Sequence, residues 1–271
     1  MDLERYNKIL GLDSYQPLTS QVCFTPWFGE FGWYIFNHVK RIHGYNHNYK
    51  IACIKPGHEC LFPTVKEFYY NWKDIGDRMK AGVVPMKRND GLLQQLSTNY
   101  PNATLISHTD TSWEEKETLA HFKFIPKPVN DFGLETDVVV MPRYRKVVDN
   151  KRNWRYHNWQ ALVDNLVAAG YRVGLCGTKK TSYQLTNITH YAWDHVDIDS
   201  DVEMILKTKL VIGQDSGLIY LAGLCRRPVI MIGQCFTPIT SLHLDQDVFF
   251  YNVLGEMPAV TEAALQFFKD H

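Results

Sequence analysis

The stretch Leu206–Gln234 reads LKTKLVIGQDSGLIYLAGLCRRPVIMIGQ, and its pattern decides the fold. The apolar run Leu210–Ile212 predicts a short buried strand that leads into the turn Gly213–Gly217. A helix-length apolar segment, Leu218–Cys225, comes next, and Val229–Ile232 predicts a second buried strand. Because a helix-length segment connects the two strands, they can run parallel, and the stretch predicts one βαβ unit.

The turn Asp215-Ser216-Gly217 has the composition of an anion-binding site. Its small residues let a ligand approach the backbone, and the N–H groups in the first turn of the following helix favour a negative charge. We expect these N–H groups and the Ser216 hydroxyl to contact a phosphate, and we expect Asp215 to cap the loop or to bind a sugar hydroxyl. An ordinary βα loop that keeps glycine only for packing would have the same sequence.

The chain on both sides of this unit continues to alternate between strands and helices. In the C-terminal half, the other expected strands are Asp137–Met141, Tyr171–Cys176, His195–Ile198 and Val248–Tyr251. The other expected helices are Asn158–Ala169, Ser200–Lys207 with Ser200 as its cap, and Thr261–Asp270. The continuous apolar run in Asp137–Met141 is typical of a strand buried on both faces of a parallel sheet.

Residues 21–107 show the same alternation more weakly. The expected strands are Gln21–Thr25, Lys50–Ile54 and Ala103–Ser107, and the expected helices are Trp33–His43, Cys60–Tyr70 and Arg88–Tyr100. Two prolines mark Pro126–Glu135 as the connection between domains. We therefore expect an α/β protein with an N-terminal domain at residues 1–130 and a C-terminal domain at residues 131–271.

The composition favours a soluble protein without a nucleic-acid or membrane partner. The 271 residues include 29 basic and 29 acidic side chains, so no overall field attracts nucleic acid or an anionic membrane. No apolar run approaches the roughly 20 residues of a membrane-spanning helix, and the first residues are charged where a secretory signal would be apolar. We expect a cytoplasmic protein.

The cysteines show no metal-binding spacing, and we expect them to be buried, reduced thiols. They are Cys23, Cys53, Cys60, Cys176, Cys225 and Cys235. The motifs G-x-x-x-x-G-K-[ST] and G-x-G-x-x-G are both missing from the sequence, which argues against a P-loop ATPase and a standard dinucleotide dehydrogenase.

Basic residues follow the predicted strand Asp137–Met141, at the edge where open α/β sheets bind ligands. They are Arg143, Arg145, Lys151, Arg152 and Arg155. Because guanidinium groups match phosphate oxygens in pairs, we expect at least one member of this set to contact a phosphate, although a solvated surface loop would have the same composition. Gly177 and Thr178 end the next predicted strand on the same edge and are expected to contact the nucleotide.

The C-terminal half resembles the donor-binding domain of GT-B glycosyltransferases, most closely the heptosyltransferase-like family that acts on bacterial lipopolysaccharide. The resemblance rests on three segments: DVVVMPR from residue 137, NWQALVDNLVAAGYRVGLCGT from residue 158, and VDIDSDVEMILKTKLVIGQDSGLIYLAGLCRRPVIMIG from residue 196. It implies two Rossmann-like domains that face each other across a cleft, the N-terminal one reduced in size here. Tyr220 stands where many members have a histidine after the DSG turn.

The resemblance implies transfer of a sugar from a nucleotide-sugar donor to a hydroxyl acceptor, expected on a glycan. It implies inversion, and no metal or cofactor. A carboxylate on the glycine turn of the acceptor domain makes Glu30 the expected general base, with Gly29 and Gly32 beside it as substrate contacts. Glu30 could instead hold its own loop by accepting backbone N–H bonds. His58 and His108 are the alternative bases.

Two overlapping D-x-D patterns, formed by Asp197, Asp199 and Asp201, match the metal-binding motif of GT-A glycosyltransferases. A capped helix with acidic residues in its first turn explains them without a metal, and we expect none. Two other functions stay open for the chain. One is a nucleotide-sugar epimerase of the same fold, and the other is a non-catalytic module that binds nucleotide or carbohydrate.

Overall fold

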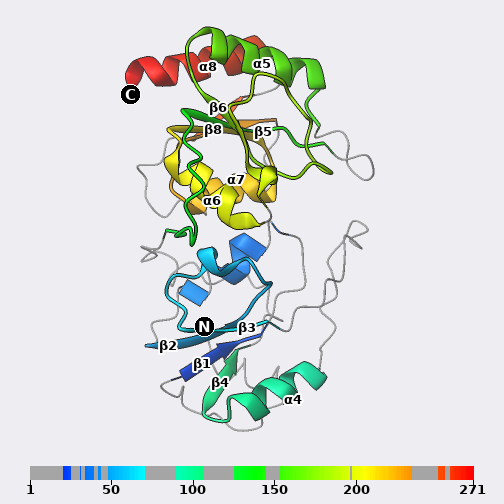
Figure 1. Ribbon diagram of the computed structural model, residues 1–271, viewed down its shortest axis with the longest axis vertical. Helices are drawn as coiled ribbons and strands as arrows, with labels where there is room; N and C mark the ends of the chain where they lie inside the picture. The colour runs from blue at the N-terminus through cyan, green and yellow to red at the C-terminus, as the bar shows by residue number, and fades with distance from the viewer. Residues whose placement is uncertain are drawn as a thin grey trace. The chain divides into compact units, whose positions relative to one another are not determined.

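The protein was analysed as a computed structural model, which forms two compact units, residues 1–124 and 125–271 (Figure 1). The structure describes residues 21–25, 31, 34–39, 42–43, 48–70, 90–106, 125–144, 153–195, 197–233, 250–253 and 257–271. The domain boundary expected after residue 130 stays a prediction. The division between the two compact units falls a few residues earlier in the chain. Each unit is described by itself below.

The second unit has a six-stranded sheet in the order β10-β9-β8-β5-β6-β7, and each neighbouring pair is parallel. The strands are β5 (Val138–Met141), β6 (Val173–Leu175), β7 (His190–Tyr191), β8 (Leu210–Gln214), β9 (Val229–Ile232) and β10 (Phe250–Val253). The helices are α5 (Tyr156–Ala168), α6 (Ile198–Lys207), α7 (Gly217–Leu224) and α8 (Met257–Asp270). The predicted βαβ unit is confirmed by β8, α7 and β9.

Helices cover both faces of this sheet (Figure 1). On one face, Val138 and Val140 of β5 share a core with Trp159 of α5 and Phe267 of α8. On the other face the glycines of the strands admit α6 and α7 closely. A Cβ at Gly174, for example, would lie 2.6 Å from the Met204 sulfur of α6. The continuous apolar strands are therefore buried on both sides, as expected for a parallel sheet.

The strand order reverses between β5 and β8. From β5 the chain adds β6 and β7 in one direction, and it then returns to add β8, β9 and β10 in the other. Met141 at the end of β5 lies opposite Gly213 near the end of β8. The crevice outside the carboxyl ends of two such strands is where open α/β sheets bind ligands, so the topology itself marks a site there.

The first unit contains a four-stranded parallel sheet in the order β3-β2-β1-β4. The strands are β1 (Gln21–Phe24), β2 (Tyr49–Cys53), β3 (Glu67–Tyr69) and β4 (Ala103–Ile106), and the helical segments are a π-helix (Tyr34–Val39), a 3-10 turn (Glu59–Leu61) and α4 (Asp90–Asn99). Cys23 and Ile51 pack against Leu92 and Leu96 of α4. With parallel sheets in both units, the expected α/β class is confirmed.

Two element predictions are wrong. Cys60–Tyr70 is not a helix, because its last residues pair with β2 as strand β3 and Tyr69 accepts the Ile54 N–H at 3.0 Å. His195–Ile198 is not a strand, since α6 begins at Ile198 and β7 lies earlier, at His190–Tyr191. The cap of α6 is Asp197 rather than the predicted Ser200, and its carboxylate accepts the Asp199 N–H at 3.0 Å. The Ser200 hydroxyl instead donates to the Ala192 carbonyl.

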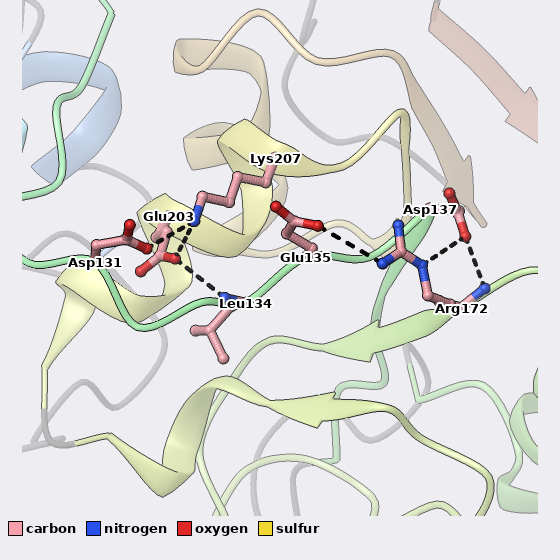
Figure 2. Close-up of polar contacts among 7 residues, drawn as sticks. All are labelled: Asp131, Leu134, Glu135, Asp137, Arg172, Glu203 and Lys207. Carbon is pink, nitrogen blue, oxygen red and sulfur yellow. Dashed lines mark hydrogen bonds and ion pairs between the residues drawn. The ribbon is translucent and has the colours of Figure 1, made fainter.

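The segment that enters β5 is held by side chains of α6. Asp199 accepts the N–H groups of Val129 and Asn130, each at 2.8 Å. One turn further on, Glu203 accepts the N–H groups of Phe132 at 2.7 Å and Leu134 at 3.1 Å. Figure 2 shows Glu203 of α6 pointing toward this segment.

Lys207, a further turn along α6, joins the same group of contacts. Its ammonium group bonds Glu203 at 2.7 Å and Asp131 at 2.8 Å (Figure 2). We call residues 129–134 the entry segment.

Five of the six cysteines lie in the described part of the chain, and all five are buried free thiols, as predicted. Burial raises the pKa of Cys23 to about 12, so that thiol stays protonated at neutral pH. Cys235 lies outside the described residues. Within the described residues, no helix has both the length and the apolar character of a membrane span.

Candidate functional site

The turn Asp215-Ser216-Gly217 leaves the carboxyl end of β8, at the place where the strand order reverses. Ser216 is the N-cap of α7, and its side chain makes no capping hydrogen bond. The first intrahelical bond is donated by Ile219 to the Ser216 carbonyl. The N–H groups of Gly217 and Leu218 precede that bond, so they are donors without a carbonyl inside the helix. Together with the helix dipole they can stabilise an anion at this point.

Asp215 is held by the helix that follows it. The Tyr220 hydroxyl donates to its Oδ1 at 2.9 Å, and both side chains are buried. Tyr220 therefore has a structural role in the second unit. The contact joins Asp215 to the helix that follows it. The two roles expected for Asp215, capping the loop and binding a sugar hydroxyl, stay predictions.

The Gly177–Thr178 loop follows β6 and lies beside the start of α7. Gly177 has a φ of +133°, and a Cβ there would lie 2.2 Å from the Ser182 hydroxyl and 3.8 Å from Leu218 of α7. Its N–H donates to Asp201 Oδ1 at 3.1 Å. Glycine is required at this position because the Ser182 side chain occupies the space where a Cβ would lie. The expected contact of Gly177 with the nucleotide stays a prediction.

Arg143 is buried, with 7% of its surface exposed, and its Nη1 donates to Asn153 Oδ1 at 3.2 Å. The backbone around it pairs with the loop after β6. The Tyr144 N–H donates to the Thr181 carbonyl at 2.7 Å, and the Tyr183 N–H donates to the Pro142 carbonyl at 2.9 Å. The segments that follow β5 and β6 are thus tied together above the sheet edge.

Arg155, the last basic residue of the predicted set, is the exposed N-cap of α5. Six other predicted site residues lie outside the described residues, and the structure does not test them. They are Gly29, Glu30 and Gly32 of the glycine turn, and Arg145, Lys151 and Arg152 of the basic loop. The alternative base His108 is also outside.

The three aspartates of the D-x-D patterns point to three different partners. Asp197 caps α6, Asp199 holds the entry segment, and Asp201 holds Gly177. Burial raises the pKa of Asp201 to about 7. Sequence reasoning did not find the contact to Gly177. The spacing shows only that Asp199 and Asp201 project from different sides of the helix, and the partner lies 24 residues away.

His58, an alternative base, lies past the end of β2 in the first unit. Its ring packs against Phe31, with ring centroids 6.2 Å apart, and against Tyr34 at 5.4 Å. Burial, with a smaller effect of Lys55, lowers the pKa of His58 to about 3. His58 is therefore neutral at neutral pH and a weak base.

Comparisons with known proteins were made at the level of family, sequence and structure. The family model described as glycosyltransferase family 9 (heptosyltransferase) matches residues 78–238, which is more than half of the chain. The chain belongs to this family. The protein is therefore a glycosyltransferase. The family match includes the basic loop, the Gly177–Thr178 loop and the turn before α7, and it begins beyond Glu30.

Solved structures show the same fold at low identity. A family 9 glycosyltransferase from Veillonella parvula has a TM-score of 0.61 at 8% identity, covering 95% of this chain and 100% of that one. The E. coli ADP-heptose lipopolysaccharide heptosyltransferase II has a TM-score of 0.60 at 12% identity, covering 92% and 99%. The E. coli heptosyltransferase WaaC with ADP has a TM-score of 0.55 at 10% identity, also covering 92% and 99%. Among curated proteins, no sequence matches the chain.

Proposed function

We propose that this family 9 enzyme transfers a sugar from a nucleoside-diphosphate sugar to a hydroxyl of a glycan, without a metal and with inversion at the anomeric carbon. The observation that carries the proposal is that the turn before α7 leaves the carboxyl end of β8 where the strand order reverses, on the same edge of the sheet as the Gly177–Thr178 loop after β6. The likeness to WaaC, whose structure holds ADP, supports a nucleoside diphosphate as the leaving group.

The reaction needs a stabilised leaving group and a deprotonated acceptor. The bond between the anomeric carbon and the diphosphate oxygen breaks, and the acceptor oxygen attacks from the opposite face of the sugar. The N–H groups of Gly217 and Leu218 and the Ser216 hydroxyl would stabilise the charge on the departing diphosphate, helped by Arg145, Lys151 and Arg152. The acceptor proton passes to the Glu30 carboxylate.

The roles of the three aspartates support the metal-independent part of the proposal. Each carboxylate of the D-x-D patterns accepts backbone N–H groups within the second unit. Recruiting them to one cation would break the cap of α6, the hold on the entry segment and the hold on Gly177 at once. Helix N–H groups and basic side chains, by contrast, can stabilise the leaving group without a metal.

The decisive experiment offers the purified chain a panel of nucleoside-diphosphate sugars in the presence of a chelator. A glycosyltransferase should slowly hydrolyse one donor without an acceptor and release the diphosphate. Interconversion of two donors would instead identify an epimerase, and saturable binding without any turnover would identify a binding module. Loss of hydrolysis on chelation, restored by a divalent cation, would contradict the metal-independent mechanism.

The base assignment is tested by Glu30→Gln. We expect donor affinity within about twofold of the wild type and a turnover lower by about 10²-fold or more, because general-base catalysis contributes this much. Glu135→Gln, which changes an exposed carboxylate in the same way, is the matched control and should keep full turnover. Turnover that survives in Glu30→Gln would remove Glu30 as the base.

A further inference from the structure

Asp201 is a buried carboxylate that the proposed reaction does not use. It is 8% exposed and projects from the first turn of α6 toward the end of β6, where it accepts the Gly177 N–H. Two neighbouring acids of the same helix, Asp199 and Glu203, are occupied with the entry segment instead. Asp201 is thus the acid of this group that reaches the sheet edge where the donor is expected.

The loop that Asp201 holds is sterically tight. A side chain at Gly177 would overlap the Ser182 hydroxyl, and the Thr178 and Thr181 hydroxyls bond each other at 2.7 Å across the loop. A Cβ at Gly177 would also lie 3.8 Å from the side chain of Leu218 in the first turn of α7, so the loop faces that turn. A displacement of the Gly177 N–H would therefore move the loop relative to the N–H groups that are expected to bind the diphosphate.

We propose that Asp201 is a positioning residue that sets the Gly177–Thr178 loop against the first turn of α7 in the arrangement that receives the donor pyrophosphate. This inference rests on the proposed function and deepens it. Asp201 acts through the Gly177 backbone and does not touch the donor. Its oxygen atom sets the loop position, whereas its charge opposes the arrival of an anionic donor. The two effects can be separated, because asparagine keeps the oxygen and removes the charge.

Several ionisable groups lie on α6 and on the segments around it, among them His195, whose ring packs against Phe132 with centroids 4.4 Å apart. Burial raises the pKa of Asp201 to about 7, with a further contribution from the charge of Asp197. Burial also keeps the thiols of Cys176 and Cys225 protonated, by raising their pKa values. On the elements packed against α6, Asp194 is paired with Lys179 at 3.4 Å and the Tyr220 hydroxyl bonds Asp215. On the entry segment, Asp131 pairs with Lys207.

The test measures donor affinity by calorimetry on the full chain at pH 6 and pH 8. The probes are ADP-ribose, UDP-glucose and GDP-mannose, because their pyrophosphate diesters carry no phosphate group that titrates between these pH values. Asp201 is mostly neutral at pH 6 and mostly charged at pH 8. We therefore expect wild-type affinity for the bound probe to fall by about threefold to tenfold as pH rises.

Three variants separate position from charge. Asp201→Asn should keep the low-pH affinity at both pH values. Asp201→Ala should lose about tenfold or more in affinity at both, because the Gly177 N–H loses its acceptor. Glu203→Gln, on the same helix but facing the entry segment, should keep wild-type affinity and pH dependence even though it lowers stability.

The failures of this inference and of the proposed function look different. If wild-type protein binds neither these probes nor any member of the panel of nucleoside-diphosphate sugars, both are overturned. If the wild type and Asp201→Ala bind a probe with equal affinity, only this inference is overturned. The same holds if the affinity of Asp201→Asn depends on pH as that of the wild type does. Hydrogen exchange supplies a readout without a ligand. The Gly177 amide should exchange faster in Asp201→Ala than in Asp201→Asn, and equal rates would overturn the positioning role.

Discussion

Gly177 and Gly170 both adopt a positive φ, but they differ in the space beside the backbone. At Gly177 a Cβ would lie 2.2 Å from the Ser182 hydroxyl, whereas nothing lies within 4 Å at Gly170. Gly170→Ala should therefore show mainly the backbone strain, of about 1 kcal/mol. Gly177→Ala adds a collision and should lower the free energy of unfolding by about 2–4 kcal/mol. Urea unfolding measures both variants, and equal losses would contradict the crowding at Gly177.

Asp201 makes the stability of the protein depend on pH. Its pKa is raised to about 7 in the folded protein, so between about pH 4 and pH 7 the folded state binds one more proton than the unfolded state. Stability from this group is present at low pH and is lost as pH rises through 7. The loss between pH 5 and pH 8 amounts to about 2–3 kcal/mol.

The variant Asp201→Asn isolates this contribution. Three histidines, His38, His43 and His58, have pKa values lowered mainly by burial and act in the opposite sense. These histidines are present in both the wild type and Asp201→Asn, so their contribution cancels in the comparison. The stability gained by Asp201→Asn over the wild type should therefore be larger at pH 8 than at pH 5, by urea unfolding at each pH. A difference that does not change with pH would contradict the raised pKa.

For individual residues, the sequence predicts where a site lies but not which side chains contact each other within it. The turn Asp215-Ser216-Gly217 could be found because small residues between two apolar runs are visible in the sequence. The bonds from Tyr220 to Asp215 and from Gly177 to Asp201 could not be found, since spacing gives the face of a helix and not the partner across it. Arg143 was expected among basic residues that contact a phosphate, with a solvated loop as the alternative. Its burial was not predicted, and it arises because the loop after β6 pairs with its backbone.

Helix α6 is the element that connects the entry segment with the candidate site. Glu203 is 1% exposed and accepts three hydrogen bonds, from Phe132, Leu134 and Lys207. Glu203→Ala leaves two backbone N–H groups and an ammonium group without this acceptor. The free energy of unfolding should fall by about 2–4 kcal/mol, which denaturant unfolding can measure.

Glu135 provides the control for this prediction. It forms an ion pair of 3.8 Å with Arg172 in which both side chains are largely exposed (Figure 2). Solvent screens such a pair, so Glu135→Ala should leave stability almost unchanged. If Glu203→Ala also left the free energy of unfolding unchanged, the buried hydrogen bonds of α6 would not hold the entry segment.

Secondary structure is predicted well for segments that are apolar throughout. It is predicted poorly where pairing with another strand determines whether a segment is a helix or a strand. Val138–Met141 and Val229–Ile232 are apolar throughout, and both are strands as expected. Cys60–Tyr70 has residues that fit either period, and only its pairing with β2 makes the last part a strand. Asp197 caps α6 in place of Ser200 because the helix begins earlier than its apolar pattern does.

For the whole molecule, the entry segment decides where the second unit begins. Asp199 is 2% exposed, and in the folded unit it accepts N–H groups from Val129 and Asn130. A fragment of residues 125–271 keeps these bonds, whereas a fragment of residues 131–271, which starts at the boundary expected from the sequence, lacks them. The shorter fragment should unfold at a temperature lower by about 5 °C or more.

Differential scanning calorimetry of the two fragments measures this difference. A third fragment, residues 128–271, is the matched control, because it removes three residues without touching the bonds to Asp199. Its unfolding temperature should equal that of the longest fragment. Equal unfolding temperatures for all three fragments would show that residues 125–130 add nothing to the second unit, and would support the boundary expected after residue 130.

The grip of α6 on residues 129–134 also has a mechanical consequence. Tension carried along the chain from residues 125–128 would reach the carboxylates of Asp199 and Glu203 before it reached β5. These bonds lie in succession along the helix, so they would be loaded one after another and would yield before the central strand of the sheet was pulled. The bonds to α6 would thus protect the backbone pairing of β5 from tension applied along the chain.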